Sequence, residues 1–341
     1  MEPFLPKRVF FEPKALDYSL GRRLYDFFRQ KDIEVRMTAS HNRVTGIPGK
    51  TASEGYREAK ETLVVGVRKN GSFATCKPSA HYQLPLATSC PGMCEYCYLA
   101  TTLGKKPYLR VYVNIEEILD QAQAYINERA PEITVFEGSA TSDPIPTEYL
   151  TGALKRTIEF FGRQELGRFR FVTKYSQVES LLDAQHNGHT RFRFSLNAAT
   201  IIDRYEHRTA SMAERVEAAA KVARAGYPLG FIVAPIFVYP GWEEDYQAMF
   251  SALDAQLPLD ARKGVTFEFI SHRFTTRAKA NVLDIFPHTT LPLNEETRKF
   301  KFGQFGYGKY VYTAEVMQAI KTFMQRQVAA YFPAAKTEYF V

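Results

Sequence analysis

Apolar and polar positions alternate regularly along the middle of the chain. Five runs rich in Val, Ile, Leu and Phe have the length of strands, and amphipathic stretches of helical length separate them. The expected strands are residues 133–139, 168–176, 191–199, 229–238 and 265–274. The expected helices are residues 115–130, 147–163, 176–185, 212–226 and 242–256. Strands that alternate with helices of this length predict right-handed β-α-β units and a parallel sheet.

One further strand before the first cysteine of the middle region brings the repeats to about six, which is too few to close an eight-stranded barrel. We therefore expect an α/β fold built on a partial (β/α)6 TIM-type barrel over residues 81–290. Residues 1–80 mix one helical pattern with two strand-like runs, which predicts an N-terminal α/β extension. Residues 291–341 are expected to form a C-terminal β-hairpin and a terminal helix.

The composition is that of an ordinary globular protein, with 45% hydrophobic and 24% charged residues. No apolar run reaches the roughly eighteen residues of a transmembrane helix, so no membrane partner is expected. The N-terminus has no small-residue cleavage site after an apolar stretch, unlike a signal peptide. Four cysteines, three of them crowded together, do not make the spaced framework of a secreted disulfide protein. We expect a cytoplasmic protein.

Positive charge is concentrated in the last quarter of the chain. From residue 261 onward there are 12 Lys and Arg against 6 Asp and Glu, whereas the preceding 260 residues hold 32 against 31. This excess predicts that a polyanion binds there, although a solvated basic surface would give the same count.

The stretch RKFKFGQFGYGKYVY, residues 298–312, carries four basic residues, six aromatic residues and no acid. Alternating Lys and Phe followed by GQFGYG predicts a β-hairpin. Basic side chains neutralise phosphates, and aromatic rings stack on bases or wedge between them. Lys301, Phe302 and Tyr307 are therefore candidate contacts to nucleic acid. The alternative is a hairpin whose aromatic side chains only cover the barrel.

Polar residues lie at the ends of four of the expected strands, those at 133–139, 168–176, 191–199 and 265–274. Since functional groups of parallel α/β barrels lie at the carboxyl ends of the strands, these residues predict one functional rim. Any one of them could instead be a local cap or a surface residue. They are Ser139, Thr141, Ser142, Asp143, Lys174, Ser176, Ser195, Asn197, Ser271, His272 and Arg273.

The segment SCPGMCEYCYLAT places Cys90, Cys94 and Cys97 in a C-x3-C-x2-C pattern. Three nearby thiolates suit zinc or an iron–sulfur cluster. A structural zinc site normally has four ligands, and neither His81 nor Cys76 has the usual spacing for the fourth. A [4Fe–4S] cluster held by three cysteines keeps one iron open. The alternative is three cysteines that serve only as small buried hydrophobic residues.

This cysteine pattern, placed after the first strand of an α/β repeat, resembles the signature of radical S-adenosylmethionine (SAM) enzymes. The resemblance implies that Cys90, Cys94 and Cys97 hold a [4Fe–4S] cluster. It also implies that the amino and carboxylate groups of SAM chelate the fourth iron. One electron from the cluster would then split the sulfonium and release a 5′-deoxyadenosyl radical.

The segments CEYCYL and FEGSATSDPIP, with the basic aromatic C-terminus, resemble the spore photoproduct lyase family along most of the chain. The resemblance implies a DNA repair lyase that reverts the UV-induced dimer 5-thyminyl-5,6-dihydrothymine to two thymines. The adenosyl radical would take a hydrogen from C6 of the dimer, and the bond that joins the bases would break. A cysteine would donate a hydrogen atom to the remaining thymine radical, and Tyr96 and Tyr98 would relay the radical back.

Groups at the strand ends are chemically suited to hold the cofactor. Lys174 can pair with the methionine carboxylate of SAM, and Ser142 and Ser195 can bond its polar ends or its ribose. Asp143 belongs to the same predicted site, and the backbone at Ala234 could border the adenine. Without the resemblance to the family, Tyr96 and Tyr98 would be interpreted as packing residues.

The implied partners are double-stranded DNA that carries the dimer and a one-electron reductant such as a flavodoxin or ferredoxin. The implied location is the cytoplasm of the bacterial spore. A dimer inside a duplex must be flipped out to reach a barrel mouth. His272, Arg273 and Arg277 are candidates to contact the lesion or its phosphate.

The chain departs from the family pattern at the proposed hydrogen donor. The family has a cysteine before the Thr-Ser-Asp that begins at Thr141, and this chain has Ala140, which carries no S–H group. Nothing in the sequence places Cys76 near the substrate. Either the resemblance misleads, or the chain is a natural or engineered variant that lacks its hydrogen donor, and we favour an engineered Cys→Ala change. Such an impaired enzyme would start the radical reaction but quench the thymine radical poorly.

Two other functions remain open from the sequence. A radical SAM enzyme that acts on a small molecule or RNA would share the cluster but would not need a hairpin that opens DNA. A zinc-stabilised nucleic-acid-binding protein without catalysis would bind zinc and no iron. The polar strand ends argue against the second alternative.

Overall fold

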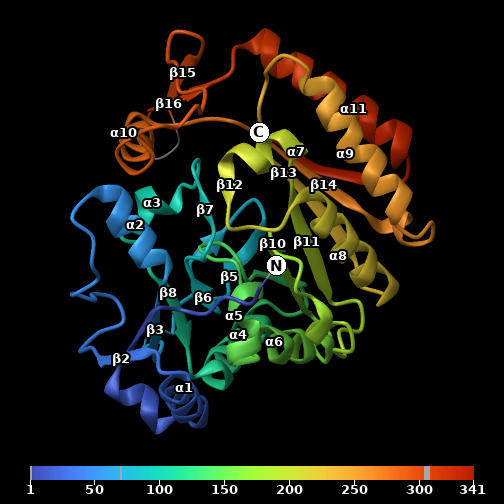
Figure 1. Cartoon of the computed structure of the whole chain (residues 1–341). Helices are drawn as coiled ribbons and strands as arrows, with labels where there is room; N and C mark the ends of the chain where they lie inside the picture. The colour runs from blue at the N-terminus through green and yellow to red at the C-terminus, as the bar shows by residue number, and fades with distance from the viewer. Residues whose placement is uncertain (1, 70, 303–307) are drawn as a thin grey trace. The chain divides into compact units, whose positions relative to one another are not determined.

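The structure is a computed structural model that describes residues 2–69, 71–302 and 308–341. Figure 1 shows the course of the chain, which divides into two compact units. The first unit comprises Met1–Pro91, Leu103–Thr173 and Gln177–Arg191. The second unit comprises Gly92–Thr102, Lys174–Ser176 and Phe192–Val341.

The first unit begins with a sheet in the order β2-β1-β3-β8-β6. The β1–β2, β1–β3 and β3–β8 pairs are parallel, and β6 is antiparallel to β8. Apolar side chains point to both faces of this sheet, as expected where a parallel sheet is covered on both sides. The strands are β1 (Arg8–Phe11), β2 (Glu34–Met37), β3 (Thr62–Gly66), β6 (Ala87–Thr88) and β8 (Leu109–Tyr112).

Four more strands of the first unit lie in the order β10-β9-β5-β4. Strand β9 is parallel to both β10 and β5, whereas β4 is antiparallel to β5. The strands predicted at 133–139 and 168–176 are therefore confirmed, with slightly shorter bounds. The four strands are β4 (Thr75–Cys76), β5 (Ala80–Gln83), β9 (Thr134–Glu137) and β10 (Gly167–Thr173).

Two of the helix predictions for this unit need correction. The single helix expected over 147–163 is two helices, because Gly152 between them has a φ of 65° and ends the first in a left-handed conformation. The helix expected over 176–185 is wrong, since only a 3₁₀ turn forms there. The helical elements are η1 (Pro13–Asp17), α1 (Ser19–Gln30), α2 (Ala52–Lys60), α4 (Ile115–Arg129), α5 (Ile145–Thr151), α6 (Ala153–Gly162) and η2 (Glu179–Leu181).

The second unit contains four parallel strands in the order β17-β14-β13-β11. The strands expected at 191–199, 229–238 and 265–274 are confirmed, but the sequence did not predict edge strand β17 after the terminal helix. A short antiparallel pair, β7 with β12, carries the second cysteine of the motif. The strands are β7 (Met93–Cys94), β11 (Thr190–Leu196), β12 (Glu206–His207), β13 (Leu229–Ile236), β14 (Thr266–Ser271) and β17 (Lys336–Phe340).

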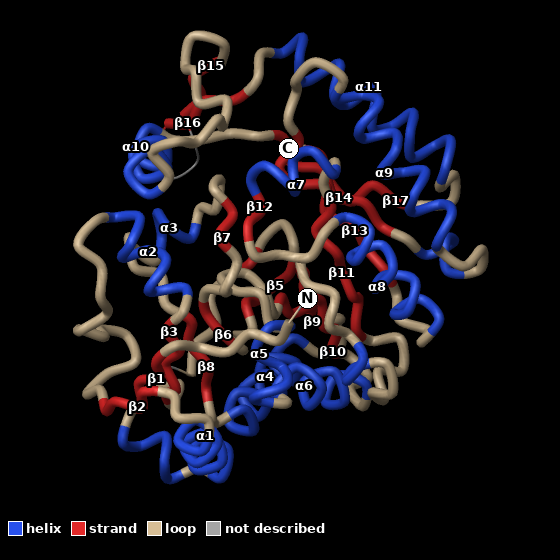
Figure 2. Tube along the Cα trace, viewed as in Figure 1, coloured by secondary structure: helices blue, strands red, loops and turns tan. Residues whose placement is uncertain are grey.

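Helices α8, α9 and α11 run beside strands β13, β14 and β17 in this unit (Figure 2). The helices predicted at 212–226 and 242–256 and the terminal helix are confirmed. None of the helices among the described residues is long and apolar enough to cross a membrane. The helical elements are α3 (Leu99–Thr102), α7 (Ala199–Tyr205), α8 (Met212–Arg224), α9 (Trp242–Gln256), η3 (Ala261–Gly264), α10 (Thr276–Ile285) and α11 (Ala314–Tyr331).

The predicted C-terminal hairpin is present. Strand β15 (Lys299–Phe302) pairs antiparallel with β16 (Gly308–Val311), and Lys301 lies opposite Lys309. The turn between them, including the candidate Tyr307, lies outside the described residues. Backbone hydrogen bonds in both directions between Phe274 and Tyr310 fasten the hairpin to the segment that follows β14.

Candidate active site

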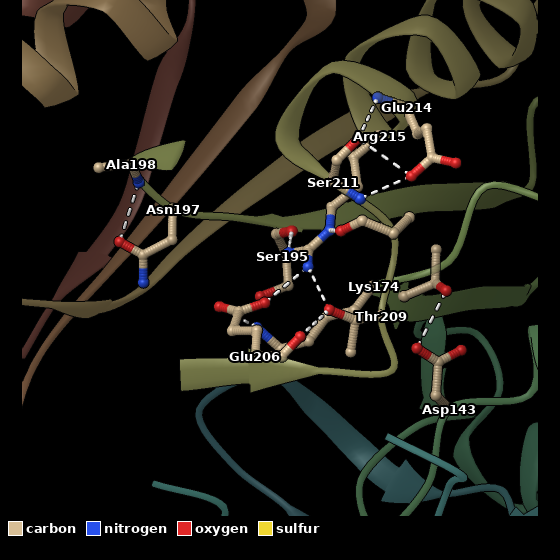
Figure 3. Close-up of polar contacts among 12 residues, drawn as sticks. Asp143, Lys174, Ser195, Asn197, Ala198, Glu206, Thr209, Ser211, Glu214 and Arg215 are labelled. Carbon is tan, nitrogen blue, oxygen red and sulfur yellow. Dashed lines mark hydrogen bonds and ion pairs between the residues drawn. The ribbon is translucent and has the colours of Figure 1, made fainter. Parts of the chain in front are cut away.

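A buried carboxylate, Glu206 of β12, organises the polar centre of the second unit. Arg215 of α8 donates from Nη2 to Glu206 Oε2 over 2.6 Å, and Lys174 Nζ lies 2.9 Å from Glu206 Oε1. The Tyr96 hydroxyl donates to the same Oε1 and lies 3.1 Å from Lys174 Nζ. The four side chains therefore form one continuous hydrogen-bonded network, part of which is drawn in Figure 3.

The charge state of this network follows from its contacts. Burial alone would raise the pKa of Glu206, but the adjacent Arg215 and Lys174 outweigh it and lower the pKa to about 2. Enclosure of the Tyr96 hydroxyl and the nearby Glu206 carboxylate raise the pKa of Tyr96 well above 10. At neutral pH the network therefore holds an ionised Glu206 and a protonated Tyr96.

The Arg215 side chain is fully enclosed and makes four hydrogen bonds. Besides Glu206, it donates to the backbone oxygens of Ser195 and Ala210 over 2.9 Å each and to the Thr209 hydroxyl over 2.8 Å (Figure 3). Arg215 therefore connects the end of β11 to the segment that leads into α8. Neither Arg215 nor Glu206 was predicted as a site residue.

Lys174 and Ser195, both predicted to bind the cofactor, lie within this network. The ion-pair partner of Lys174 in the structure is Glu206. Ser195 is buried, and its carbonyl accepts a hydrogen bond from Arg215. At the end of β13, the carbonyl of Pro235, next to the predicted Ala234, accepts a hydrogen bond from Asn197 over 2.7 Å.

In the second unit, Cys94 and Cys97 lie on the short β7 segment and in the turn after it. Cys94 is paired with Glu206 across the β7–β12 ladder, and the Cys97 amide donates to the Cys94 carbonyl over 3.1 Å. The intervening Glu95 accepts from His207 over 2.8 Å, and its own amide donates to Tyr205. These bonds connect the backbone of the cysteine turn to the segment that carries Glu206.

Cys90 lies at the end of a first-unit segment that is anchored by a buried lysine. Lys60 Nζ donates to the Cys90 carbonyl over 2.9 Å and to the Ser89 hydroxyl over 3.2 Å. Ser89 in turn donates to the Pro107 carbonyl over 2.7 Å. The four cysteines form no disulfide, and no group of three or more Cys, His, Asp or Glu side chains among the described residues is arranged to hold a metal ion.

The turn after β9 carries the residues predicted to face the cofactor and the substrate. Asp143 accepts from the Thr173 hydroxyl over 3.0 Å and from the Ile145 amide over 3.2 Å, so its carboxylate caps the start of α5. The Ser142 hydroxyl is buried and has no hydrogen-bond partner among the described residues. Ala140 lies in the same turn, two residues before Ser142.

The two tyrosines that flank Cys97 have different surroundings. Tyr96 is half-buried within the Glu206 network, and its ring packs 5.9 Å from that of Phe237. The Tyr98 side chain is 58% exposed.

His272 does not have the surroundings expected of a phosphate contact. It is buried and stacks on Phe237 with 4.4 Å between ring centroids. Burial, together with the nearby Arg298, lowers the pKa of His272 to about 3, so the ring is neutral at pH 7. Arg298 donates to the His272 carbonyl over 2.9 Å and stacks on the ring of Tyr312.

The other DNA candidates that the structure describes are exposed. Arg273, Arg277, Lys301 and Phe302 all reach solvent, with Phe302 74% exposed. Partial burial and the positive charges of Arg273 and Lys301 lower the pKa of Lys309, which places these three cations near one another. The hairpin thus presents positive charge and an exposed aromatic ring on one element.

Comparison with known proteins identifies the family. A family model described as spore photoproduct lyase matches residues 4–341. The spore photoproduct lyase of Bacillus subtilis (strain 168) is 54% identical over 338 residues, which cover 99% of each chain. The chain belongs to the spore photoproduct lyase family. The relative from Geobacillus sp. (strain Y412MC61) is 53% identical over 340 residues, with both chains fully covered.

Solved structures agree over the whole chain. A "Spore photoproduct lyase C140A/S76C mutant with bound AdoMet and dinucleoside spore photoproduct" has a TM-score of 0.97 and 54% identity, with both chains fully covered. A Y98F mutant has a TM-score of 0.96 and 53% identity at the same coverage. The predicted family, the partial-barrel fold class, the radical SAM lyase activity and the [4Fe–4S] and SAM cofactors are therefore confirmed.

Proposed function

We propose that this chain reverts spore photoproduct in double-stranded DNA to two thymines, in the cytoplasm of the bacterial spore. A flavodoxin or ferredoxin is proposed as the one-electron reductant. One observation carries the proposal: a relative that is 54% identical and matches the fold over the whole chain was solved with AdoMet and the dinucleoside lesion bound. The names of the relatives from Bacillus and Geobacillus support the spore location.

The proposed ligands of the cluster are Cys90, Cys94 and Cys97. The donor set fits the group, because three thiols that form no disulfide lie within eight consecutive residues and sulfur is the ligand that iron–sulfur clusters use. When bound, the cluster and SAM supply the 5′-deoxyadenosyl radical. The hydrogen bonds that anchor Cys90 to Lys60 and Cys97 to Cys94 hold the backbone of the motif in place.

The proposed SAM contacts are Ser142, Lys174, Ser195 and the backbone at Ala234. The buried Ser142 hydroxyl supports this assignment, because a buried hydroxyl group without a partner is unfavourable and a ligand would satisfy it. Lys174 is a cation, so its ammonium group is chemically suited to pair with the carboxylate of SAM. Asp143 contributes indirectly, by fixing the turn that carries Ser142.

Tyr96 and Tyr98 are the proposed relay residues. Tyr96 keeps its phenolic hydrogen because its pKa is raised, and Glu206 fixes the direction of the O–H group. The exposed side chain of Tyr98 would contact the DNA when it binds. Lys174 holds the Tyr96 oxygen from a second direction.

The proposed DNA-binding region is residues 291–341 together with the segment that follows β14, and residues 81–290 are proposed to hold the chemistry. Arg273, Arg277 and Lys301 would neutralise phosphates, and Phe302 would stack on a base or fill the gap left by the flipped lesion. The buried, neutral His272 would support the segment that follows β14 through its stacking on Phe237, rather than bind phosphate.

We also propose that positions 76 and 140 of this chain correspond to the two exchanged positions of the solved double mutant. The two chains cover one another fully at 54% identity. The double mutant has Ala at position 140 and Cys at position 76, as this chain does.

The test of the proposed function is a repair assay. The chain is reconstituted anaerobically with iron and sulfide, then supplied with SAM, dithionite and dinucleoside spore photoproduct, and an undamaged dinucleoside serves as the control. We expect lesion-dependent formation of the repaired dinucleoside, detected by mass spectrometry. An unchanged lesion, in a protein that carries its cluster and cleaves SAM, would overturn the proposal.

A further inference from the structure

We propose that Cys76 supplies the hydrogen atom that ends the radical reaction in this chain, in place of a thiol at position 140. The inference rests on the proposed function, because it is the thymine radical formed from the lesion that must be quenched. It opposes the interpretation of the chain as an impaired enzyme: the thiol has been relocated, not lost.

Of the four cysteines, one is a candidate for the hydrogen-atom donor. The sequence contains four cysteines, and Cys90, Cys94 and Cys97 are the proposed cluster ligands. A cysteine that ligates a metal does so as a thiolate and has no S–H hydrogen to donate. Ala140 cannot donate one either. Cys76 is half-buried and forms no disulfide, so it carries an S–H bond rather than an S–S bond.

The segments that carry positions 76 and 140 belong to the first unit and are adjacent in its sheet. Cys76 ends β4, which pairs with β5, and β5 pairs with β9. Ala140 follows β9 by three residues. The β4–β5 hairpin that carries Cys76 and the turn that carries Ala140 are therefore attached to two neighbouring strands, β5 and β9.

A single buried carboxylate joins the two turns more directly. Glu137 accepts from the Ser79 hydroxyl over 2.8 Å and from the Ser139 hydroxyl over 2.7 Å. Ser79 is three residues after Cys76, and Ser139 immediately precedes Ala140. Arg170 strengthens the link by donating to the Ser79 carbonyl over 3.1 Å. The segment next to position 76 and the segment next to position 140 are thus both hydrogen-bonded to Glu137.

The paired exchange gives the second, independent reason. A loss of the thiol at position 140 alone would leave the thymine radical without a donor. This chain combines Ala140 with Cys76, and the proposed correspondence with the solved double mutant pairs the same two exchanges in a relative that binds the lesion. The loss of one thiol combined with the gain of another is what the relocation of a hydrogen-atom donor would produce.

The transfer is balanced in atoms and electrons. The S–H bond of Cys76 breaks, a C–H bond forms at the methylene carbon of the thymine radical, and the product is a thymine methyl group with Cys76 left as a thiyl radical. The thiyl radical recovers its hydrogen from a tyrosine O–H, for which Tyr96 and Tyr98 are proposed. The hydrogen on the tyrosine is replaced from 5′-deoxyadenosine, which the family's reaction supplies.

The test uses the exchange of thiol hydrogen with solvent, which carbon-bound hydrogen does not undergo. The reconstituted chain is run in D₂O with SAM, dithionite and the dinucleoside lesion. We expect one deuterium per repaired dinucleoside, in the methyl group that forms from the bridging methylene carbon. Cys76→Ser should abolish the deuterated product while formation of 5′-deoxyadenosine continues. Cys76→Ser combined with Ala140→Cys should restore the deuterated product.

Each other outcome has a defined meaning. If Cys76→Ser still gives deuterated thymine at the rate of the parent chain, the assignment of Cys76 is wrong. If the parent chain consumes the lesion without making repaired thymine, the assignment is also wrong, and the interpretation as an impaired enzyme holds. If the parent chain leaves the lesion intact, the proposed function itself fails.

A second readout does not depend on turnover. The reconstituted chain, with SAM but without reductant, is treated with iodoacetamide, and alkylation of Cys76 is followed by peptide mass spectrometry. We expect the dinucleoside lesion to slow alkylation relative to an undamaged dinucleoside, because a donor must lie against the substrate. Equal rates with the two dinucleosides, at a lesion concentration that saturates binding, would overturn the proposal.

Discussion

Replacing Glu206 by Gln should destabilise the fold strongly, because the substitution keeps the shape of the side chain and removes its charge. Arg215 would then remain fully enclosed with only neutral acceptors, and Lys174 would lose its ion-pair partner. A folded-state pKa of about 2 in place of the ordinary 4.5 corresponds to about 3 kcal/mol, since each pKa unit is worth about 1.4 kcal/mol. Breaking a buried ion pair typically costs about 3–5 kcal/mol, which agrees.

The lowered pKa of Glu206 also predicts how the difference in stability between the variant and the parent chain depends on pH. The pKa of Glu206 is lowered in the folded state, so its stabilisation is fully present above pH 4.5 and is lost as the pH falls toward 2. The free energy of unfolding of Glu206→Gln should therefore lie about 3 kcal/mol below that of the parent chain at pH 7. The difference should shrink progressively below pH 4.5.

The assay is urea unfolding of the anaerobic chain, followed by circular dichroism at a series of pH values. Asp183→Asn is the matched control, because Asp183 forms an equally short ion pair with Lys155 at the surface, where such pairs contribute little. The control should unfold like the parent chain. A Glu206→Gln variant as stable as the parent at pH 7 would refute the reasoning.

Three further predictions concern other parts of the chain. The lowered pKa of His272 means that folding opposes its protonation, so the free energy of unfolding should fall from pH 6.5 toward pH 3, by about 2 kcal/mol at pH 5. His272→Phe should remove this part of the pH dependence in urea unfolding. An unchanged pH profile would contradict the burial of the ring. Arg273→Ala should weaken binding of lesion-containing DNA and reduce the slope of log affinity against log salt concentration by about 1. Lys14→Ala, an exposed control, should leave both the affinity and the slope unchanged. Equal slopes for Arg273→Ala and the parent chain would show that Arg273 does not contact DNA. Cys94→Ala should prevent uptake of about four irons per chain during reconstitution, and full iron content in that variant would contradict its role as a ligand.

The strand pattern was predictable because each strand of the barrel region is a short apolar run bounded by polar residues. The five predicted strands all formed, and so did the hairpin with its alternating Lys and Phe. The helix predicted over 147–163 failed at one residue, Gly152, whose left-handed conformation divides it in two. Edge strand β17, with exposed positions and few apolar residues, gave no comparable signal.

The polar network was not predictable in the same way. Glu206 and Arg215 are ordinary charged residues in sequence, and only the β7–β12 pairing and the packing of α8 bring them together in a buried site. The burial of His272 was not predictable either, because burial cannot be inferred for one polar residue at the end of a strand. The spacing of Cys90, Cys94 and Cys97, by contrast, is local and could be interpreted without a structure.

The most direct test of the account is the fate of dinucleoside spore photoproduct in D₂O with the reconstituted chain, SAM and dithionite. We predict repaired dinucleoside in which the one methyl group formed from the bridging methylene carbon carries one deuterium, with no requirement for a cysteine at position 140. Loss of the lesion without repaired dinucleoside would contradict the role of Cys76, and an unreacted lesion would contradict the proposed repair activity.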